Sequence, residues 1–359
     1  MELRFKRKEY GMKKIVVFPI NREYLKLLSV KLRILKKYNL VGITVAGEKI
    51  SGCKTDNIKI SNDFYSELKD ADILWILDTI DYIDFDKVIL PRVQSAIKSG
   101  VEVYASHNII NEMNKIFSSE KLHSYDYKEI MLDIMDEYCL KIDTPIVCIA
   151  GIGDLYEQFY IELNYRREIL NKEIKMFQLG SRRESKLFGF EPIPNFVFDN
   201  QTSVKDKIIM FNHYLKQIEI EYTPELIVIG IPGSLITLEE GIKSDYGIIA
   251  SILTATINID YSIIQIPYGL YPLDAMEKLS KVLGIKYGLY GDCYIVSNKM
   301  IALNESREEH EIRYIKLPEN LEEMKGNSVK AMYIYEDFAE SLVMDSITKL
   351  ENYSSIRLI

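Results

Sequence analysis

The feature that most constrains this fold is a repeated alternation of short apolar runs with longer amphipathic runs. Short runs rich in β-branched residues, such as KKIVVFPI (13–20) and LVGITVAG (40–47), are typical of strands, and the longer runs carry apolar residues at helical spacing. The strand runs are almost continuously apolar, as expected of strands buried on both faces of a parallel sheet under helices. The sequence therefore predicts an α/β protein with mostly parallel sheets.

The chain is too long for one ordinary core, because 359 residues exceed the usual size of a single domain. A break at Asp143-Thr144-Pro145 precedes a second series of strands and helices. We therefore predict two domains, the first Rossmann-like and the second similar to a degenerate phosphate-loop domain. The expected parts are an N-terminal arm (1–11), the Rossmann-like domain with a helical bridge (12–142), the second α/β domain (143–300) and a strand-helix extension (301–359).

Three segments of the first domain carry local predictions. Apolar residues at helical spacing predict a helix within 22–37, and LPRVQSAIKSG predicts a helix over 90–100 that ends at a glycine. The segment 109–143 is expected to be mostly helical. The turn after the first strand, FPINREY, contains no glycine, so an ordinary dinucleotide site is not expected there.

Composition narrows the classes of partner. The net charge of −8 argues against nucleic-acid binding, which requires a basic face. No apolar run reaches the roughly 18 residues that a membrane-spanning helix needs, so no membrane association is expected. The four cysteines and four histidines are scattered, which predicts no metal site and suits a reducing cytoplasm. The 25 tyrosines are compatible with a homo-oligomer, because half-buried aromatic residues favour interfaces.

The stretch IVCIAGIGDLYEQF (146–159) predicts a strand, a glycine turn and a helix whose N-terminus faces a ligand. Gly151 and Gly153 permit a close approach, and Asp154 is either a ligand contact or the helix N-cap. In the phosphate-loop pattern the lysine position holds Glu157 and the Ser/Thr position holds Gln158. Nucleotide hydrolysis is therefore not expected, and the turn is either structural or a site for another ligand.

Two further loops of the second domain are candidate ligand contacts. QLGSRRES contains Gly180, Ser181, Arg182 and Arg183, and arginine pairs match carboxylate or phosphate oxygens. We expect this turn to lie beside the glycine turn, although a solvated basic turn remains the alternative.

The other loop, GIPGSL, ends a buried strand with Pro232, Gly233 and Ser234, and no carboxylate stands where a metal-holding one would be. Asp199 and Asp245 are the nearest acidic residues in sequence, and either suits a cap or turn equally well.

The order IAGIGDLYEQF, FQLGSRRESKLFGFEPIPNFVFDN and PELIVIGIPGSL resembles the peptide maturation system proteins of clostridia, over about Met12 to Asn298. These proteins are encoded beside radical-SAM enzymes and small Cys-containing precursor peptides. A more distant resemblance is to a two-domain family that includes D-glutamate N-acyltransferase-type proteins. It rests on two groups of residues: Pro91, Arg92, Ala96, Ile97, Gly100; and Gly233, Ser234, Leu235.

The resemblance implies an accessory protein of ribosomal peptide maturation, with a precursor peptide and a radical-SAM enzyme as partners. Such a protein would bind an anionic ligand, such as a nucleotide or CoA, or the peptide itself, at the loops of the second domain. The alternative is a transferase that uses an acyl or nucleotide donor. A third interpretation treats every glycine as an ordinary turn, and the sequence leaves open whether the protein is an enzyme.

Overall fold

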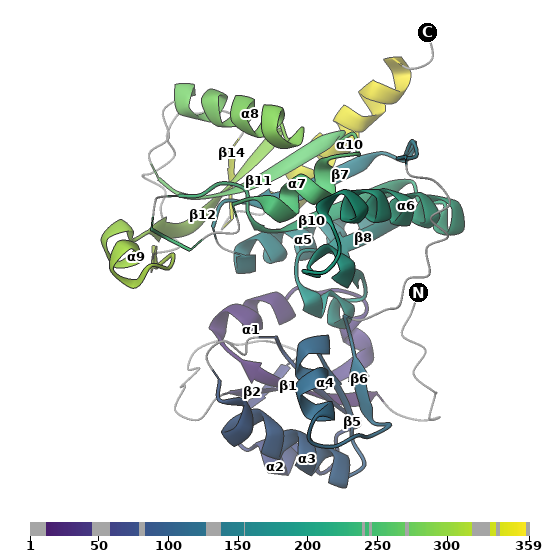
Figure 1. The fold of residues 1–359 in the computed structure, drawn as a ribbon, viewed down its shortest axis with the longest axis vertical. Coiled ribbons are helices and arrows are strands. Elements are labelled where there is room, and N and C mark those ends of the chain that lie inside the picture. Colours follow the sequence, from purple (N-terminus) through teal and green to yellow (C-terminus); the bar gives the residue numbers. More distant parts are fainter. Residues whose placement is uncertain are drawn as a thin grey trace. The chain divides into compact units, whose positions relative to one another are not determined.

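The computed structural model divides the chain into two units, each with its own sheet (Figure 1). Unit 1 comprises Met1–Glu129 and Arg182–Asn195, and unit 2 comprises Ile130–Ser181 and Phe196–Ile359. The prediction of an α/β protein with two mostly parallel sheets is confirmed. The structure describes residues 12–44, 58–78, 83–126, 138–153, 155–238, 241–243, 246–269, 273–317, 331–334 and 338–356.

The sheet of unit 1 has the order β3-β2-β1-β4-β5-β6, and each pairing is parallel. This is the order of a doubly wound Rossmann fold, in which the chain reverses direction across the sheet beside β1. The strands are β1 (Lys13–Ile20), β2 (Tyr38–Thr44), β3 (Ile58–Ser61), β4 (Ile73–Ile76), β5 (Glu102–Ala105) and β6 (Leu122–Ser124).

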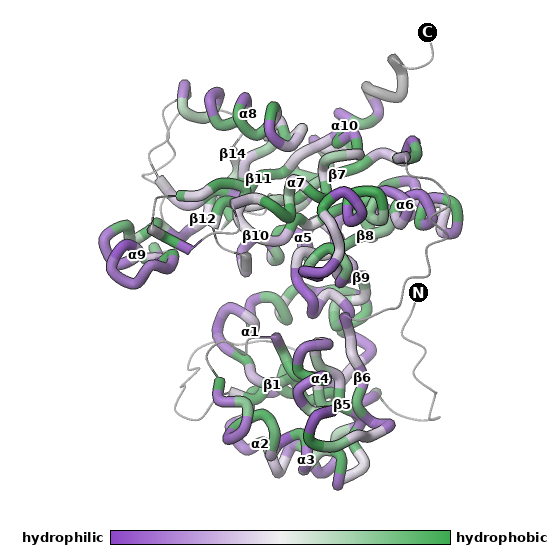
Figure 2. The backbone as a smooth tube through the Cα atoms, in the orientation of Figure 1, coloured by the Kyte–Doolittle hydropathy of each residue, from purple (hydrophilic) through white to green (hydrophobic). Residues whose placement is uncertain are grey.

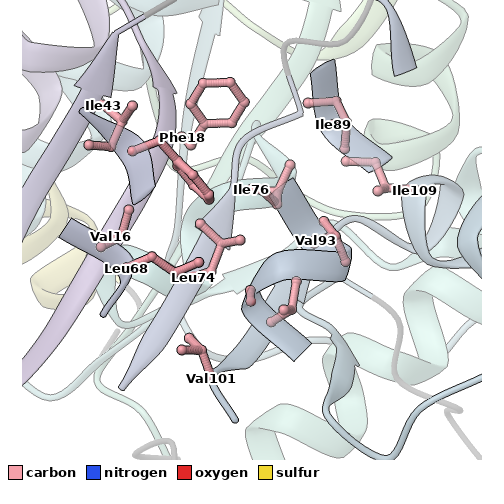
Figure 3. Close-up of a cluster of buried hydrophobic side chains, with 14 of the residues drawn as sticks. Val16, Phe18, Ile43, Leu68, Leu74, Ile76, Ile89, Val93, Val101 and Ile109 are labelled. Carbon is pink, nitrogen blue, oxygen red and sulfur yellow. The ribbon is translucent and has the colours of Figure 1, made fainter. Parts of the chain in front are cut away.

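Helices pack on the sheet of unit 1 through one continuous apolar cluster. Figure 3 shows Val16, Leu74 and Ile76 from the strands gathered with Val93 and Ile109 from the helices. The cluster takes alternate residues of each strand, and residues between them such as Val17 and Trp75 are buried as well. Burial on both faces of the sheet explains why the strand sequences are apolar throughout. The helical elements are α1 (Arg22–Leu28), η1 (Leu35–Lys37), α2 (Phe64–Leu68), the π-helical turn η3 (Phe85–Ile89), α3 (Leu90–Lys98) and α4 (His107–Asn114).

The turn after β1, where a Rossmann fold normally binds its dinucleotide, leads directly into the capped helix α1. Asn21 caps α1 by accepting a hydrogen bond from the Tyr24 N–H at 2.8 Å. The Ile20 side chain packs against Gly42 of the neighbouring strand, where a methyl group would collide with it. Arg92 lies over the rings of Phe18 and Phe64, 4.7 Å and 5.3 Å from their centroids.

Residues 182–195 follow β8 of unit 2 in sequence and nevertheless pack in unit 1. This segment contains the 3-10 helix η4 (Arg183–Phe188) and the short strand β9 (Glu191–Pro192). Phe188 is buried against Tyr24, with 6.4 Å between the ring centroids. Gly189 has φ +84° and lies against Ile34, so a side chain there would be both strained and crowded.

The sheet of unit 2 has the order β13-β12-β11-β7-β10-β8, and β14 pairs with β12. All of these pairings are parallel except the antiparallel contact between β12 and β13. The extension after residue 300 therefore adds strands to this sheet. The strands are β7 (Ile146–Gly151), β8 (Met176–Gly180), β10 (Leu226–Ser234), β11 (Tyr261–Tyr268), β12 (Cys293–Ile301), β13 (Tyr314–Lys316) and β14 (Ala331–Tyr333).

The core of unit 2 is formed by the strands together with α5 and α10. Tyr165 of α5 is fully buried and bonds Ser346 of α10 at 2.9 Å. More exposed helices such as α8 alternate hydrophobic and hydrophilic residues along their length (Figure 2). The helical elements are α5 (Leu155–Asn171), η5 (Asn195–Val197, at the unit boundary), α6 (Val204–Tyr222), α7 (Ile248–Thr254), α8 (Leu273–Tyr287), α9 (Leu303–Glu309) and α10 (Phe338–Ile356).

Two local helix predictions are wrong in extent. Within 22–37 the helix ends at Leu28, where the Ser29 hydroxyl donates to the carbonyl of Lys26 and the chain turns. Within 109–143 the helix ends at Asn114, and residues 122–124 instead form β6, which pairs with β5, while residues 127–137 lie outside the described residues. A polar turn overrides helical periodicity in the first place, and strand pairing overrides it in the second. The predicted arm over 1–11 lies outside the described residues.

Candidate functional site

The glycine turn of unit 2 joins β7 to α5 at the carboxyl edge of the sheet, as the sequence predicts. Gly153 has φ +101°, a conformation that glycine adopts without strain. A methyl group at Gly153 would collide with the hydroxyl of Tyr314, so that tyrosine lies directly against the turn. The candidate residue Asp154 lies outside the described residues, as does Asp245.

Glu157 and Gln158, which replace the lysine and hydroxyl residue of a phosphate loop, are both buried. The Gln158 Nε2 lies 2.8 Å from the carbonyl of Ile231, 3.3 Å from that of Ile149 and 3.2 Å from Glu162 Oε1. All three partners are acceptors, so the nitrogen end of the amide is fixed toward them. The oxygen end of Gln158 therefore points elsewhere, and it has no hydrogen-bond partner among the described residues.

Gln265 of β11 converges on the same glycine. A methyl group at Gly151 would lie 2.8 Å from Gln265 Oε1 and 2.9 Å from Gln158 Oε1. Gln265 is fully buried, and within the described part of the chain neither its oxygen nor its nitrogen has a hydrogen-bond partner. Buried amides are normally paired, so two of them converging on one glycine form a candidate contact for a polar group of a ligand.

Glu162, one turn further along α5, connects this turn to the next two strands. Its carboxylate is fully buried, lies against Gly230 and accepts the Ser181 N–H at 3.1 Å. Gly230 leaves room for the carboxylate, because a side chain there would collide with it. The turn at Gly180 and Ser181 is thus held by α5, and its N–H groups do not all face outward.

The loop with Pro232, Gly233 and Ser234 lies beside the glycine turn. Ser234 is the register partner of Gly151, and the Leu235 N–H donates to the Gly151 carbonyl at 3.0 Å. Gly233 has φ +83°, which allows the bend at this end of β10. The Ser234 hydroxyl donates to the carbonyl of Ile236 at 2.8 Å. Five of the candidate residues therefore gather at one edge of unit 2: Gly151, Gly153, Pro232, Gly233, Ser234.

Arg182 and Arg183 lie in unit 1, where carboxylates pair with them. Arg182 contacts Glu184 at 3.1 Å, and Arg183 contacts Asp126 at 3.2 Å and Asp78 at 3.5 Å. This differs from the arginine pair that the sequence suggests for an anion. The reason is that residues 182–195 pack in unit 1 although they follow a strand of unit 2.

The remaining polar candidate that the structure describes, Asp199, has a structural role, and the described residues contain no grouped set of metal ligands. Asp199 accepts hydrogen bonds from the Gln201 N–H and the Thr202 hydroxyl, so it forms a local turn. The Thr202 hydroxyl is the main reason that the pKa of Asp199 is lowered. Among the described residues, no three His, Cys, Asp or Glu side chains are grouped to hold a metal ion. None of the described helices has both the length and the apolar character needed to cross a membrane.

Sequence reasoning missed the two amides that define the turn of unit 2. Gln265 gives a signal that could be found, because it interrupts the apolar run YSIIQIPY. In the sequence pattern, Gln158 stands out only because it replaces the Ser or Thr hydroxyl of a phosphate loop. Asp126 of unit 1 gives no comparable signal, because its partner Arg183 is 57 residues away in the chain.

No family model and no curated protein matches this sequence. Among solved structures, it is similar to a DUF1611 family protein from Anabaena variabilis. The TM-score is 0.54 at 10% identity, and the match covers 79% of this chain and 87% of that chain. At this identity the similarity shows the fold alone.

Two peptide ligases are also similar over much of the chain. A pseudomurein peptide ligase type C from Methanothermus fervidus gives a TM-score of 0.26 at 12% identity, covering 89% of this chain and 47% of the ligase. The UDP-N-acetylmuramate:L-alanyl-gamma-D-glutamyl-meso-diaminopimelate ligase from Neisseria meningitides gives 0.31 at 11% identity, covering 81% of each chain. Scores this low carry no argument, so the finding that stands is a two-sheet α/β fold shared with a DUF1611 family protein.

Proposed function

We propose that unit 2 binds a small polar ligand at its glycine turn without hydrolysing a nucleotide. In this proposal the protein is an accessory component of ribosomal peptide maturation, and ligand binding at the turn serves that role. The single observation that carries the binding proposal is the pair of buried amides, Gln158 and Gln265, which meet at Gly151 with hydrogen-bonding atoms unpaired among the described residues.

The cost of leaving these amides unpaired supports a ligand. A buried polar group without a partner costs about 1–3 kcal/mol, and such groups are rare in folded proteins. The amides lie at the carboxyl edge of parallel strands, where open α/β sheets bind their ligands. They also lie beside the start of α5, whose N-terminal end favours negative charge. A ligand or an ordered water would satisfy them, and binding measurements distinguish the two.

The surroundings of Gln158 argue against nucleotide hydrolysis. A phosphate loop needs a lysine for the phosphates and a hydroxyl for Mg²⁺ at the start of its helix. Here Glu157 would repel phosphate, and the Gln158 nitrogen bridges the carbonyls of two strands. Neither side chain can take the missing role without breaking the packing of α5, because both are buried.

The biological role rests on the sequence resemblance to peptide maturation proteins. It implies a precursor peptide and a radical-SAM enzyme as partners. In this proposal the ligand binds while the protein is in complex with these partners, or it controls the formation of that complex. The transferase alternative uses the same turn to hold a nucleotide or CoA donor. Detection of acyl or nucleotidyl transfer to a peptide or amino acid would favour this transferase alternative.

Calorimetric titration with ATP, GTP and acetyl-CoA, each with and without Mg²⁺, tests binding. Near 100 times the dissociation constant, a ligand raises the free energy of unfolding by about 2.7 kcal/mol, so a thermal shift should accompany binding. We expect binding that does not require Mg²⁺ and produces no phosphate. A precursor leader peptide, titrated in the same way, tests the peptide as the ligand.

A matched pair of variants locates the site. Gln265→Met removes an unpaired amide at the turn, whereas Thr256→Val removes an unpaired buried hydroxyl that precedes β11. Binding should be lost in the first and kept in the second. If none of the four probes binds the wild-type protein, or if Gln265→Met binds as well as the wild type, the proposed site is wrong.

A further inference from the structure

The carboxyl edge of the sheet in unit 1 carries polar residues from three neighbouring strands. Asp78 follows β4, Ser106 follows β5 and Asp126 follows β6. Parallel strands bring these positions to one edge, where a Rossmann fold binds its ligands. Here the edge presents carboxylates, which would repel a phosphate.

A guanidinium group already lies on these carboxylates. Arg183 Nη1 is 3.2 Å from Asp126 Oδ2, and its Nε is 3.5 Å from Asp78 Oδ2. The guanidinium thus spans two carboxylates through different nitrogens, which a planar fork of donors does well. The Asp126 side chain is fully buried, whereas that of Arg183 is 27% exposed.

The two carboxylates are positioned independently of Arg183. Asp126 Oδ1 accepts the His107 N–H at 2.6 Å, at the start of α4, and the Ser124 hydroxyl at 2.9 Å. Asp78 Oδ1 accepts the Ser106 hydroxyl at 2.9 Å. These contacts engage the Oδ1 atoms, and the Oδ2 atoms of both residues contact Arg183, so groups other than the arginine also position the two carboxylates.

A separate, neutral group at this edge lacks a partner. Tyr125 is 4% exposed, and its hydroxyl has no hydrogen-bond partner among the described residues. Burial raises the pKa of Tyr125 well above 10, and the charges of Glu184 and Asp78 raise it further. Tyr125 directly precedes Asp126 in the chain, so it is a further polar group near this edge of the sheet.

Among the described residues, three carboxylates and two guanidinium groups pair at this edge: Asp78 and Asp126 with Arg183, and Glu184 with Arg182. Burial, then the nearby Glu184, raises the pKa of Asp78 above its ordinary 3.8, and Arg183 only partly opposes this. A surplus of negative charge favours a cationic ligand at this edge.

We propose that the carboxyl edge of unit 1 is a guanidinium-binding site, which Arg183 occupies within its own chain and which the arginine of a partner peptide can enter in its place. Segment 182–195 is the occupant seen in the structure, held also by the buried Phe188. The site is specific for guanidinium over ammonium because Asp78 and Asp126 are contacted by two nitrogens of one planar group.

Chemical rescue of Arg183→Ala in the full-length protein tests the proposal. Trp75 is the only tryptophan and stacks on Tyr125, with 5.0 Å between ring centroids, so its fluorescence reports on this edge. We expect Arg183→Ala to lower the melting temperature of unit 1 by several degrees. Millimolar methylguanidinium or N-acetylarginine amide should restore most of that loss, and methylammonium should not.

Three comparisons make the result decisive. Arg182→Ala removes a guanidinium that pairs with Glu184, whereas the ion pairs of Asp78 and Asp126 are with Arg183, so the same additives should not restore the lost stability. Arg183→Lys should recover less stability than methylguanidinium gives to Arg183→Ala, because its ammonium cannot span both carboxylates. If Arg183→Ala does not fold alone, methylguanidinium present during refolding should recover the Trp75 signal. Absence of rescue, or equal rescue by methylammonium, would overturn the proposal.

Discussion

The two sheets present different chemistry where their strands end, although both are mostly parallel and both bring strand ends to one edge. The edge of unit 1 is charged, and its carboxylates hold the Arg183 guanidinium. The edge of unit 2 at Gly151 is lined by the neutral amides of Gln158 and Gln265, which keep unpaired atoms within the described residues. A buried charge must be paired, because its desolvation costs far more than that of an amide. The carboxylates of the charged edge are therefore paired by Arg183 of the same chain. The amide edge can remain unpaired at a smaller energetic cost until a ligand binds.

The largest expected effect comes from removing a buried charge in unit 1. Asp126→Asn should lower the stability of unit 1 by about 3 kcal/mol, because the change weakens a buried ion pair and the acceptor at the start of α4. Urea denaturation followed by Trp75 fluorescence measures it. The exposed Asp86→Asn is the control and should change stability by less than about 0.5 kcal/mol. Equal effects of the two would show that the charged edge contributes nothing.

The second effect is steric and belongs to unit 2. Gly151→Ala should cost about 1–3 kcal/mol, because its methyl group would press on both amide oxygens. Hydrogen exchange in β7 and β11 should quicken, while exchange in the strands of unit 1 stays unchanged. Ligand binding should also be lost. A variant with unchanged exchange would mean that the amides do not converge on this glycine.

The third prediction has the opposite sign. Gln265→Met should stabilise unit 2 by about 1 kcal/mol, because an unpaired buried amide is replaced by an apolar side chain of similar volume. Protection of β11 against hydrogen exchange should rise. The comparison with Asp126→Asn is informative, since removal of a charge would then destabilise one edge and removal of a neutral amide would stabilise the other. A clear loss of stability would show that the amide is already satisfied.

The smallest effect is a pH dependence in unit 1. The pKa of Asp78 is raised by burial and by Glu184, so the folded state binds its proton more tightly than the unfolded state. The stabilising contribution of the protonated Asp78 carboxyl is fully present below pH 3.8, and it is lost as the pH rises through the pKa of Asp78 in the folded state. Asp78→Asn should therefore look more stable relative to wild type at neutral pH than at pH 3.8. Titration of urea midpoints measures this, and a parallel shift at all pH values would contradict it.

Much of the architecture could be predicted, because it depends on local pattern. The strands at 13–20 and 146–151 and the helix at 204–222 appear where apolar runs and periodicity indicate. The errors lie where a contact distant in sequence decides. Residues 122–124 form a strand because β5 offers an edge, and nothing in their own sequence specifies that pairing.

The candidate site was predictable only in part. Glycines can be recognised in the sequence because tight turns and close approaches favour them, and Gly151, Gly153 and Gly233 do lie at one edge of the sheet. The residues that give this edge its chemistry, Gln158 and Gln265, are separated by more than one hundred positions and act through burial. Burial is a property of the folded unit, so a sequence pattern could not show that these amides are unpaired.

By itself, the sequence determined the α/β class, the glycine turn before α5 and the loss of a phosphate-loop lysine at Glu157. These follow from local rules of periodicity, backbone conformation and charge. Only the tertiary structure decided which carboxylates Arg183 would meet and which unit residues 182–195 would join. An ion pair depends on the distance between side chains in space, and chain order alone does not set that distance.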